Sequence, residues 1–115
     1  MRPVIKGLSH DLYELNTYLP EDIENFCLSF RIRIGPECSI GADNFDLSIC
    51  TPKWLDESLW EPQWGKGLLI IRKYDFGVIR NLIQNYVDAC EGESWHEIAM
   101  QLSSVFLWEY EGYRP

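Results

Sequence analysis

The strongest constraint on the fold is a pair of helix signals between residues 75 and 102. In the first, Asp75 is a candidate N-cap, and apolar residues recur at helical spacing until Gly92, which suits a left-handed helix end. In the second, Ser94 and Glu97 form a capping-box pattern. The two apolar stripes are Phe76, Ile79, Leu82, Ile83, Tyr86, Val87, Cys90 and Trp95, Ile98, Ala99, Leu102. The sequence therefore predicts two helices joined by a short corner, and each helix needs a surface to cover.

Two alternating runs supply such a surface. Residues 26–34 and 45–50 alternate between apolar side chains and Cys, Ser, Arg or Asp, which is typical of half-buried strands. Gly35-Pro36 is expected to end the first strand, and Cys50 is expected to point outward with Asp46 and Ser48. Pairing Ile34 with Phe45 keeps the apolar residues on one face and sets Arg33 opposite Asp46, which is the predicted register. The residues predicted to face inward are Phe26, Leu28, Phe30, Ile32, Ile34, Phe45, Leu47 and Ile49.

The remaining segments complete an α+β pattern. Thr51 and Pro52 predict the start of a short helix that fades by Glu61-Pro62. Further strands are expected at residues 3–9, 68–73 and 106–110, and the aliphatic run at 68–73 suggests a strand that is central or covered on both sides. Residues 11–25 are expected to be an irregular connection. Residues 111–115 are expected to be loose.

We therefore predict a single mostly antiparallel sheet of about five strands, with the C-terminal helix pair packed on one face. The helices between the fourth and fifth strands allow that pair to be parallel. No internal boundary is visible, so residues 1–115 are expected to form a single domain.

The net charge of the chain limits the classes of binding partner. The chain has 18 acidic and 10 basic residues, a net charge of −8, which argues against nucleic acid or an anionic membrane as a partner. A basic protein would suit it, although the charge also serves solubility. The N-terminal sequence has no apolar stretch typical of a signal peptide, and no segment is apolar enough to span a membrane, so a cytoplasmic protein is expected.

No catalytic, metal or cofactor motif stands out. Cys27, Cys38, Cys50 and Cys90 form no C-x-x-C pair and lack a nearby histidine, which argues against zinc; disulfides would require an oxidising compartment. His96 lies between acids but is offset from the apolar stripe, and a solvated histidine is predicted. Alternation similarly predicts that Glu109 is an exposed strand residue, and nucleophile signatures are absent.

The tryptophans fall into two groups. Trp54 and Trp95 each open a helix and are predicted to anchor the core. Trp60 and Trp64 lie in a loop with acidic neighbours, a composition found where an interface meets a cationic surface. The alternative is that both rings fold back onto the core.

Several segments carry a family resemblance over nearly the whole chain. They are Tyr18-Leu-Pro-Glu-Asp-Ile-Glu-Asn-Phe26, Ile34-Gly-Pro36, Phe45-Asp46, Cys50-Thr-Pro-Lys-Trp-Leu55, Cys90-Glu-Gly-Glu-Ser-Trp95-His-Glu-Ile-Ala99 and Trp108-Glu-Tyr-Glu111. In this order they resemble the immunity proteins of bacterial polymorphic toxin and contact-dependent inhibition systems, in the family numbered eight. The resemblance implies a cytoplasmic protein, encoded beside a secreted toxin, that binds and blocks the toxin domain without catalysis or a cofactor. The family's characteristic tryptophan matches either Trp54 or Trp95, with a structural role.

The predicted partner is therefore a cognate toxin domain, basic and of the nuclease type, which an acidic inhibitor would occlude. The predicted contact residues are Glu57, Trp60, Glu61 and Trp64, with Glu21, Asp22 and Glu24 as a second set. Two other classes stay open. One is a structural or regulatory homo-oligomer with Trp60 and Trp64 between subunits, and the other is a small enzyme or ligand-binding module, which needs a deep pocket with convergent polar groups.

Overall fold

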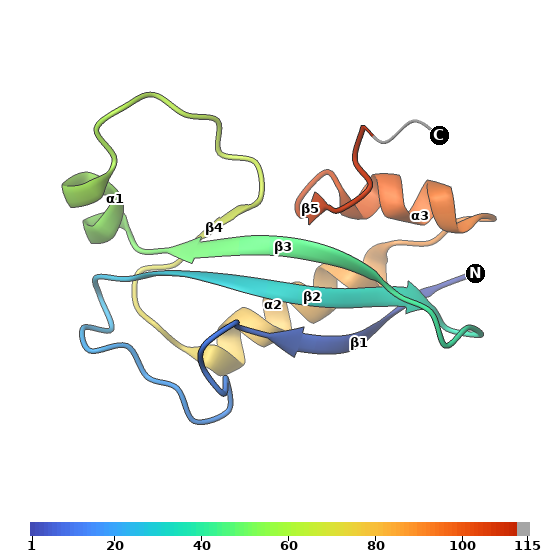
Figure 1. Cartoon of the computed structure of the whole chain (residues 1–115), viewed down its shortest axis with the longest axis horizontal. Helices are drawn as coiled ribbons and strands as arrows, with labels where there is room; N and C mark the ends of the chain where they lie inside the picture. Colours follow the sequence, from blue (N-terminus) through green and yellow to red (C-terminus); the bar gives the residue numbers. More distant parts are fainter. Residues whose placement is uncertain (113–115) are drawn as a thin grey trace.

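The computed structural model describes residues 1–112, and within them five strands and three helices form the α+β arrangement that the sequence predicts (Figure 1). In chain order the elements are β1 (Pro3–Ser9), β2 (Cys27–Pro36), β3 (Asp43–Cys50), α1 (Pro52–Ser58), β4 (Leu68–Ile70), α2 (Phe76–Ala89), α3 (Trp95–Leu102) and β5 (Leu107–Trp108). The irregular segment predicted for residues 11–25 is confirmed, and it consists of turns and bends.

The strands form one mostly antiparallel sheet in the order β1-β2-β3-β4, with β5 also paired to β3. Ser48–Cys50 of β3 pair with β4, whereas Phe45 and Asp46 pair with β5, so β4 and β5 occupy different stretches of the same strand edge. The parallel pair is β3 and β4, which α1 connects. The expectation of a parallel pair between the fourth and fifth strands is wrong, because both strands pair with β3 instead.

The register of the β2–β3 hairpin differs from the predicted one. Ile32, not Ile34, lies opposite Phe45, and Arg31, not Arg33, lies opposite Asp46. A shift of two residues leaves every side chain on its predicted face, so the apolar pattern alone does not distinguish the two registers. The observed register lets the Arg31 guanidinium donate two hydrogen bonds to Asp46, at 2.9 and 3.2 Å.

Strand β2 also continues past its predicted end. Gly35 and Pro36 belong to β2, because Val4 and Pro3 of β1 pair with them. Pro36 lies beyond Ile34, the last residue of β2 that pairs with β3, so its missing N–H interrupts no pair with that strand. The first predicted strand, Pro3–Ser9, is confirmed at both ends.

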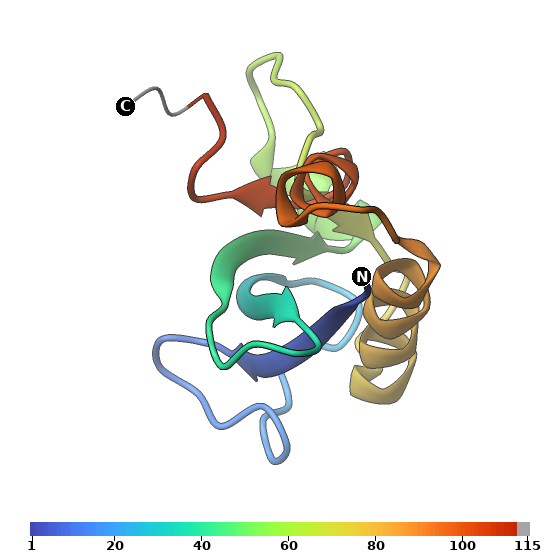
Figure 2. The same cartoon turned by 90° about the vertical axis from the view of Figure 1, so that its right-hand side faces the viewer.

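The core lies between the inward face of the sheet and the helices. Figure 2 shows α2 and α3 on the same side of the sheet, as predicted. Their stripes contribute Ile79, Ile83, Val87, Ile98, Ala99 and Leu102 to the core, together with all eight strand residues predicted to face inward. Leu82 is the exception in the first stripe and is 46% exposed.

Cys50 is buried, contrary to the prediction that it points to solvent. The chain turns into α1 at this point, and the buried Thr51 binds Phe26: its N–H donates to the Phe26 carbonyl, and its hydroxyl accepts from the Phe26 N–H at 3.2 Å. This turn covers the end of β3.

The corner between α2 and α3 differs from the prediction in the conformation of Gly92 and in the capping contacts of α3. Gly92 does not have a positive φ; Gly67 and Gly112 do, among the described residues. A Cβ at Gly92 would lie 2.9 Å from Glu97 Oε2 and 3.0 Å from Glu97 Cβ, so a larger residue there would require the Glu97 side chain to shift. Ser94 caps α3 as predicted, but the Glu97 carboxylate accepts from the Glu93 N–H at 2.9 Å, one residue before the position in a standard capping box.

The last two strands are shorter than predicted. β4 ends at Ile70, which is 56% exposed, and it lies at the end of the strand order rather than in a central position. The chain then turns so that the Tyr74 N–H donates to the Ile23 carbonyl at 2.7 Å before α2 begins. Glu111, predicted to be loose, forms an ion pair with Lys66. The loose ending predicted for residues 113–115 lies outside the described residues.

One carboxylate ties three elements together. Asp43, the first residue of β3, accepts hydrogen bonds at Oδ2 from two indole N–H groups, from Trp95 of α3 at 2.8 Å and from Trp108 of β5 at 2.9 Å. Both tryptophans pack against the core, which confirms the role predicted for Trp95. Asp43 therefore fixes where α3 and β5 meet the sheet.

We expect Asp43→Ala to lower the free energy of unfolding by about 2 kcal/mol, because two half-buried indole donors lose an ionised acceptor. Asp46→Ala is the matched control on the same strand. Its ion pair with Arg31 is about half exposed, with side-chain exposures of 50% and 44%, so a loss below about 1 kcal/mol is expected. Urea unfolding of both variants measures the difference, and equal losses would contradict the role given to Asp43.

Candidate partner-binding surface

Helix α1 is a surface helix fixed at its start. Thr51 is the N-cap, and its hydroxyl accepts from the Trp54 N–H, while Pro52 occupies the first turn, as the sequence predicts. The helix has no fully buried residue. It ends where the Leu59 N–H donates to the Leu55 carbonyl, so Glu57 lies in its last turn. Thr51 thus holds an exposed helix at one end of the sheet.

The loop after α1 displays the two tryptophans. Trp60 is 84% exposed and Trp64 is 95% exposed, so the alternative that both rings fold back onto the core is wrong. Glu57 and Glu61 are exposed as well. Figure 1 shows this loop, residues 59–67, projecting from the sheet between α1 and β4.

The far end of the loop is anchored. Lys66 forms an ion pair with Glu111, and the Gly67 carbonyl accepts from the Ser48 N–H at 2.8 Å. Gly67 has a φ of +70°, and a Cβ there would lie 2.6 Å from Leu107, so only glycine suits this position. The exposed tryptophans therefore sit on a loop that is fixed where it rejoins the sheet.

The second predicted set lies on the acidic segment, residues 18–25, on the other side of α1. Glu21, Asp22 and Glu24 are all exposed. Asn25 donates to the Glu57 carboxylate at 2.8 Å, and Lys53 lies 3.9 Å from Asp22. Glu57 and this acidic segment therefore meet, whereas the loop with Trp60 and Trp64 projects away from the segment in both views (Figures 1 and 2).

A groove runs between the acidic segment and α1, with a volume of about 770 Å³. Trp54 is half-buried and lines this groove, and it does not belong to the core cluster. The prediction that Trp54 anchors the core is thus wrong, because the short α1 packs no buried side chain against the sheet. The groove also includes Leu19 and Ile23, apolar residues that the sequence analysis did not single out although they stand among acids.

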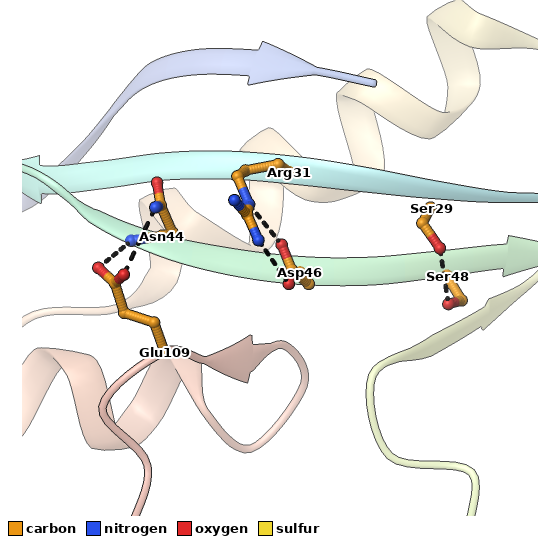
Figure 3. A network of polar contacts seen from close by, with 6 residues as sticks. All are labelled: Ser29, Arg31, Asn44, Asp46, Ser48 and Glu109. Atoms are coloured by element: carbon orange, nitrogen blue, oxygen red, sulfur yellow. Dashed lines mark hydrogen bonds and ion pairs between the residues drawn. The ribbon is translucent and has the colours of Figure 1, made fainter. Parts of the chain in front are cut away.

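The sheet face opposite the helices carries polar pairs that satisfy one another (Figure 3). Arg31 binds Asp46, and Ser29 lies 3.4 Å from Ser48 across the hairpin. Glu109, exposed as predicted, accepts from the Asn44 backbone N–H at 2.8 Å. These contacts hold β2, β3 and β5 in register, so this face has a structural role.

Pockets suited to catalysis are not apparent in the part of the chain that the structure describes. The larger hollows, of about 770, 520 and 420 Å³, are open to solvent rather than enclosed, and the apolar hollow lined by Leu47, Leu82 and Phe106 holds only about 70 Å³, far below the roughly 300 Å³ of ordinary ligand sites. Residues 1–112 contain no group of three or more His, Cys, Asp or Glu arranged to hold a metal ion. Their helices also lack the length and apolar character needed to cross a membrane. His96 is exposed, as predicted.

Comparison with known proteins gives one match. The model of a family described as Immunity protein 8 matches residues 4–113, nearly the whole chain. No curated protein and no solved structure matches significantly.

Two free thiols, those of Cys27 and Cys50, lie at the groove. Cys27 is opposite Cys50 in the β2–β3 pairing, and Cys27 lines the groove while Cys50 is buried. Burial, together with a hydrogen bond to Cys27, raises the pKa of the Cys50 thiol to about 12. The folded chain therefore holds this thiol in its protonated form.

We expect the free energy of unfolding to fall as the pH rises from about 9 towards 12, because Cys50 loses its proton in the unfolded chain but keeps it in the folded one. The fall should be shallower in Cys50→Ala. Exposed Cys38→Ala is the control and should follow the parent chain. Urea unfolding at a series of pH values under reducing conditions measures this, and parallel curves for the parent chain and Cys50→Ala would contradict it.

Proposed function

Because the chain belongs to the Immunity protein 8 family, we propose that it binds the basic, nuclease-type domain of a cognate toxin and blocks it by occlusion, without catalysing a reaction. The family implies an immunity protein against a toxin. The toxin class, the mechanism and the contact surface are our proposal. In it, residues 1–115 act as one domain in the cytoplasm of the cell that they protect.

The observation that carries the contact surface is the exposure of Trp60 and Trp64 beside Glu57 and Glu61. An exposed indole leaves a large apolar area in water, and tryptophan is enriched among the residues that dominate binding energy at interfaces. A loop that is anchored at Gly67 presents these rings before the partner arrives. The adjacent carboxylates supply charge for a cationic partner.

Charge supports the choice of a basic toxin domain. A net charge of −8 on 115 residues attracts a basic surface over a long range, which speeds encounter and orients the partner. Enzymes that cleave nucleic acids need basic surfaces for their substrates. An acidic inhibitor then competes for the surface that the nucleic acid would occupy, so binding alone is enough to block the enzyme.

The contact surface should extend beyond Glu57 at the end of α1 and beyond Trp60, Glu61 and Trp64 of the loop 59–67, which we call the tryptophan loop. A standard interface uses about 20–30 residues a side and about 800 Å² of each partner. That is about a tenth of the 7656 Å² accessible surface of this chain. Helix α1 and the acidic segment 18–25 are the neighbouring structures that provide the rest in our proposal.

The first test is protection of cells. We expect co-expression of this chain to restore growth to cells that express the toxin domain encoded beside it, and Trp60→Ala/Trp64→Ala to lose that protection. Because both rings are exposed, the double variant should fold normally, which circular dichroism checks. Full protection by the double variant would remove the tryptophan loop from the interface. Sedimentation of a dimer that this variant dissociates would favour the homo-oligomer.

The second test is the rate of association. Glu57→Lys/Glu61→Lys raises the net charge by four, from −8 to −4, and we expect association with the toxin domain to slow by about tenfold at low salt and by less at high salt. Glu37→Lys/Glu93→Lys is the matched control. It makes the same change in net charge, at two other exposed acids that lie outside the proposed contact surface. Equal slowing in both variants would mean that only the total charge matters.

A further inference from the structure

We infer that the groove between residues 18–28 and α1 is an anchoring site for a basic side chain, an arginine or lysine, of the partner protein. The inference rests on the proposed function, since that partner is the toxin domain. It adds a second contact point, distinct from the tryptophan loop, with its own chemistry.

The groove has an apolar wall at the protein surface. Leu19 is 67% exposed and Ile23 is 38% exposed, and both line the groove with the half-buried indole of Trp54. Buried Phe26 and Leu28 also contribute to its lining. A partner segment laid here would cover apolar surface that now faces water, and this provides the driving force for docking.

Charge complementarity specifies the occupant. Glu21 and Asp22 line the groove, and its lining residues include no lysine, arginine or histidine. A long cationic side chain suits this lining, because its methylene stem packs on apolar residues while its charged end reaches the carboxylates. The face of Trp54 also attracts a cation. An apolar or acidic segment would leave Glu21 without a counter-charge, because Lys53 lies near Asp22, at 3.9 Å, and no base lines the groove itself.

The walls of the groove are held in place by contacts on both sides. Asn25 donates to Glu57 of α1, and the Tyr74 N–H donates to the Ile23 carbonyl at 2.7 Å. At the other end of the segment, Tyr18 stacks on Tyr13 with ring centroids 4.2 Å apart. A site that is already ordered loses less conformational entropy when it binds.

The adjacent hollow provides an internal comparison. Glu24 lines it with Lys53 and Arg72, around a space of about 420 Å³, so two basic residues share the hollow with this acid. Basic residues therefore line the hollow of Glu24, whereas none lines the groove of Glu21. The two glutamates are three positions apart on one exposed segment, which makes them a matched pair for charge reversal.

The test measures binding of the purified toxin domain encoded beside this protein. We expect Glu21→Lys to weaken binding by about tenfold or more and Glu24→Lys by less than about threefold. Leu19→Lys is a second variant at an exposed position that should fold normally, and it should weaken binding as Glu21→Lys does, because it places a cation in the groove. Thermal unfolding of each variant confirms that it is folded.

Double-mutant cycles then identify the occupant. Glu21→Ala is combined with Ala substitutions of each arginine and lysine of the toxin domain, and we expect at least one pair to be coupled by about tenfold. Weakened binding with no coupled pair would overturn the basic occupant.

Three other outcomes would overturn the inference, and they are distinguishable. If the parent chain binds and the groove variants bind equally well, the groove is not part of the interface, and the proposed function stands. If the parent chain neither binds nor protects cells, the proposed function fails and this inference fails with it. A dimer that Leu19→Lys dissociates in sedimentation would assign the groove to a second copy of this chain.

Discussion

The antiparallel pairing of β2 and β3 is the constraint on which the rest of the structure depends. It places Phe30, Ile32, Phe45, Leu47 and Ile49 on one face, which α2 and α3 then cover. It also positions the ends of the hairpin, where Thr51 starts α1 and Asp43 receives Trp95 and Trp108. The three helices and β5 are thus located relative to one hairpin. The two ends of that hairpin have different roles.

This division explains why the proposed binding surfaces lie where they do. The Asp43 end is occupied by structural contacts between α3, β5 and the sheet. At the other end, α1 buries no residue, and the segments on either side of it stay at the surface. Loops that a rigid sheet holds in place are common positions for binding residues, because they vary without disturbing the core. The C-terminal helix pair, which dominates the sequence pattern, is used mainly for packing.

The errors in the sequence-based prediction share a physical cause. Apolar periodicity specifies which face a residue occupies but not which partner lies across from it, so the hairpin register was wrong by two residues while every inward residue was right. The local pattern also did not predict that β4 and β5 both pair with the same edge of β3, and both strands are short as a result. Gly92 was assigned a left-handed turn, although its φ is not positive and its surroundings are crowded by the Glu97 side chain instead. Each error concerns contacts between segments that are distant in sequence or packed at a corner.

The sequence by itself determined the class of fold, the helix caps, the buried faces and the family, because these depend on short-range spacing and on motifs that run along the chain. It left open whether Trp60 and Trp64 are exposed, and it misplaced Trp54 in the core. Only the tertiary structure decided these points, since exposure depends on what other segments cover a side chain. It also brought Glu57 beside Asn25 and formed the groove between α1 and the acidic segment, because both flank the same end of the β2–β3 hairpin.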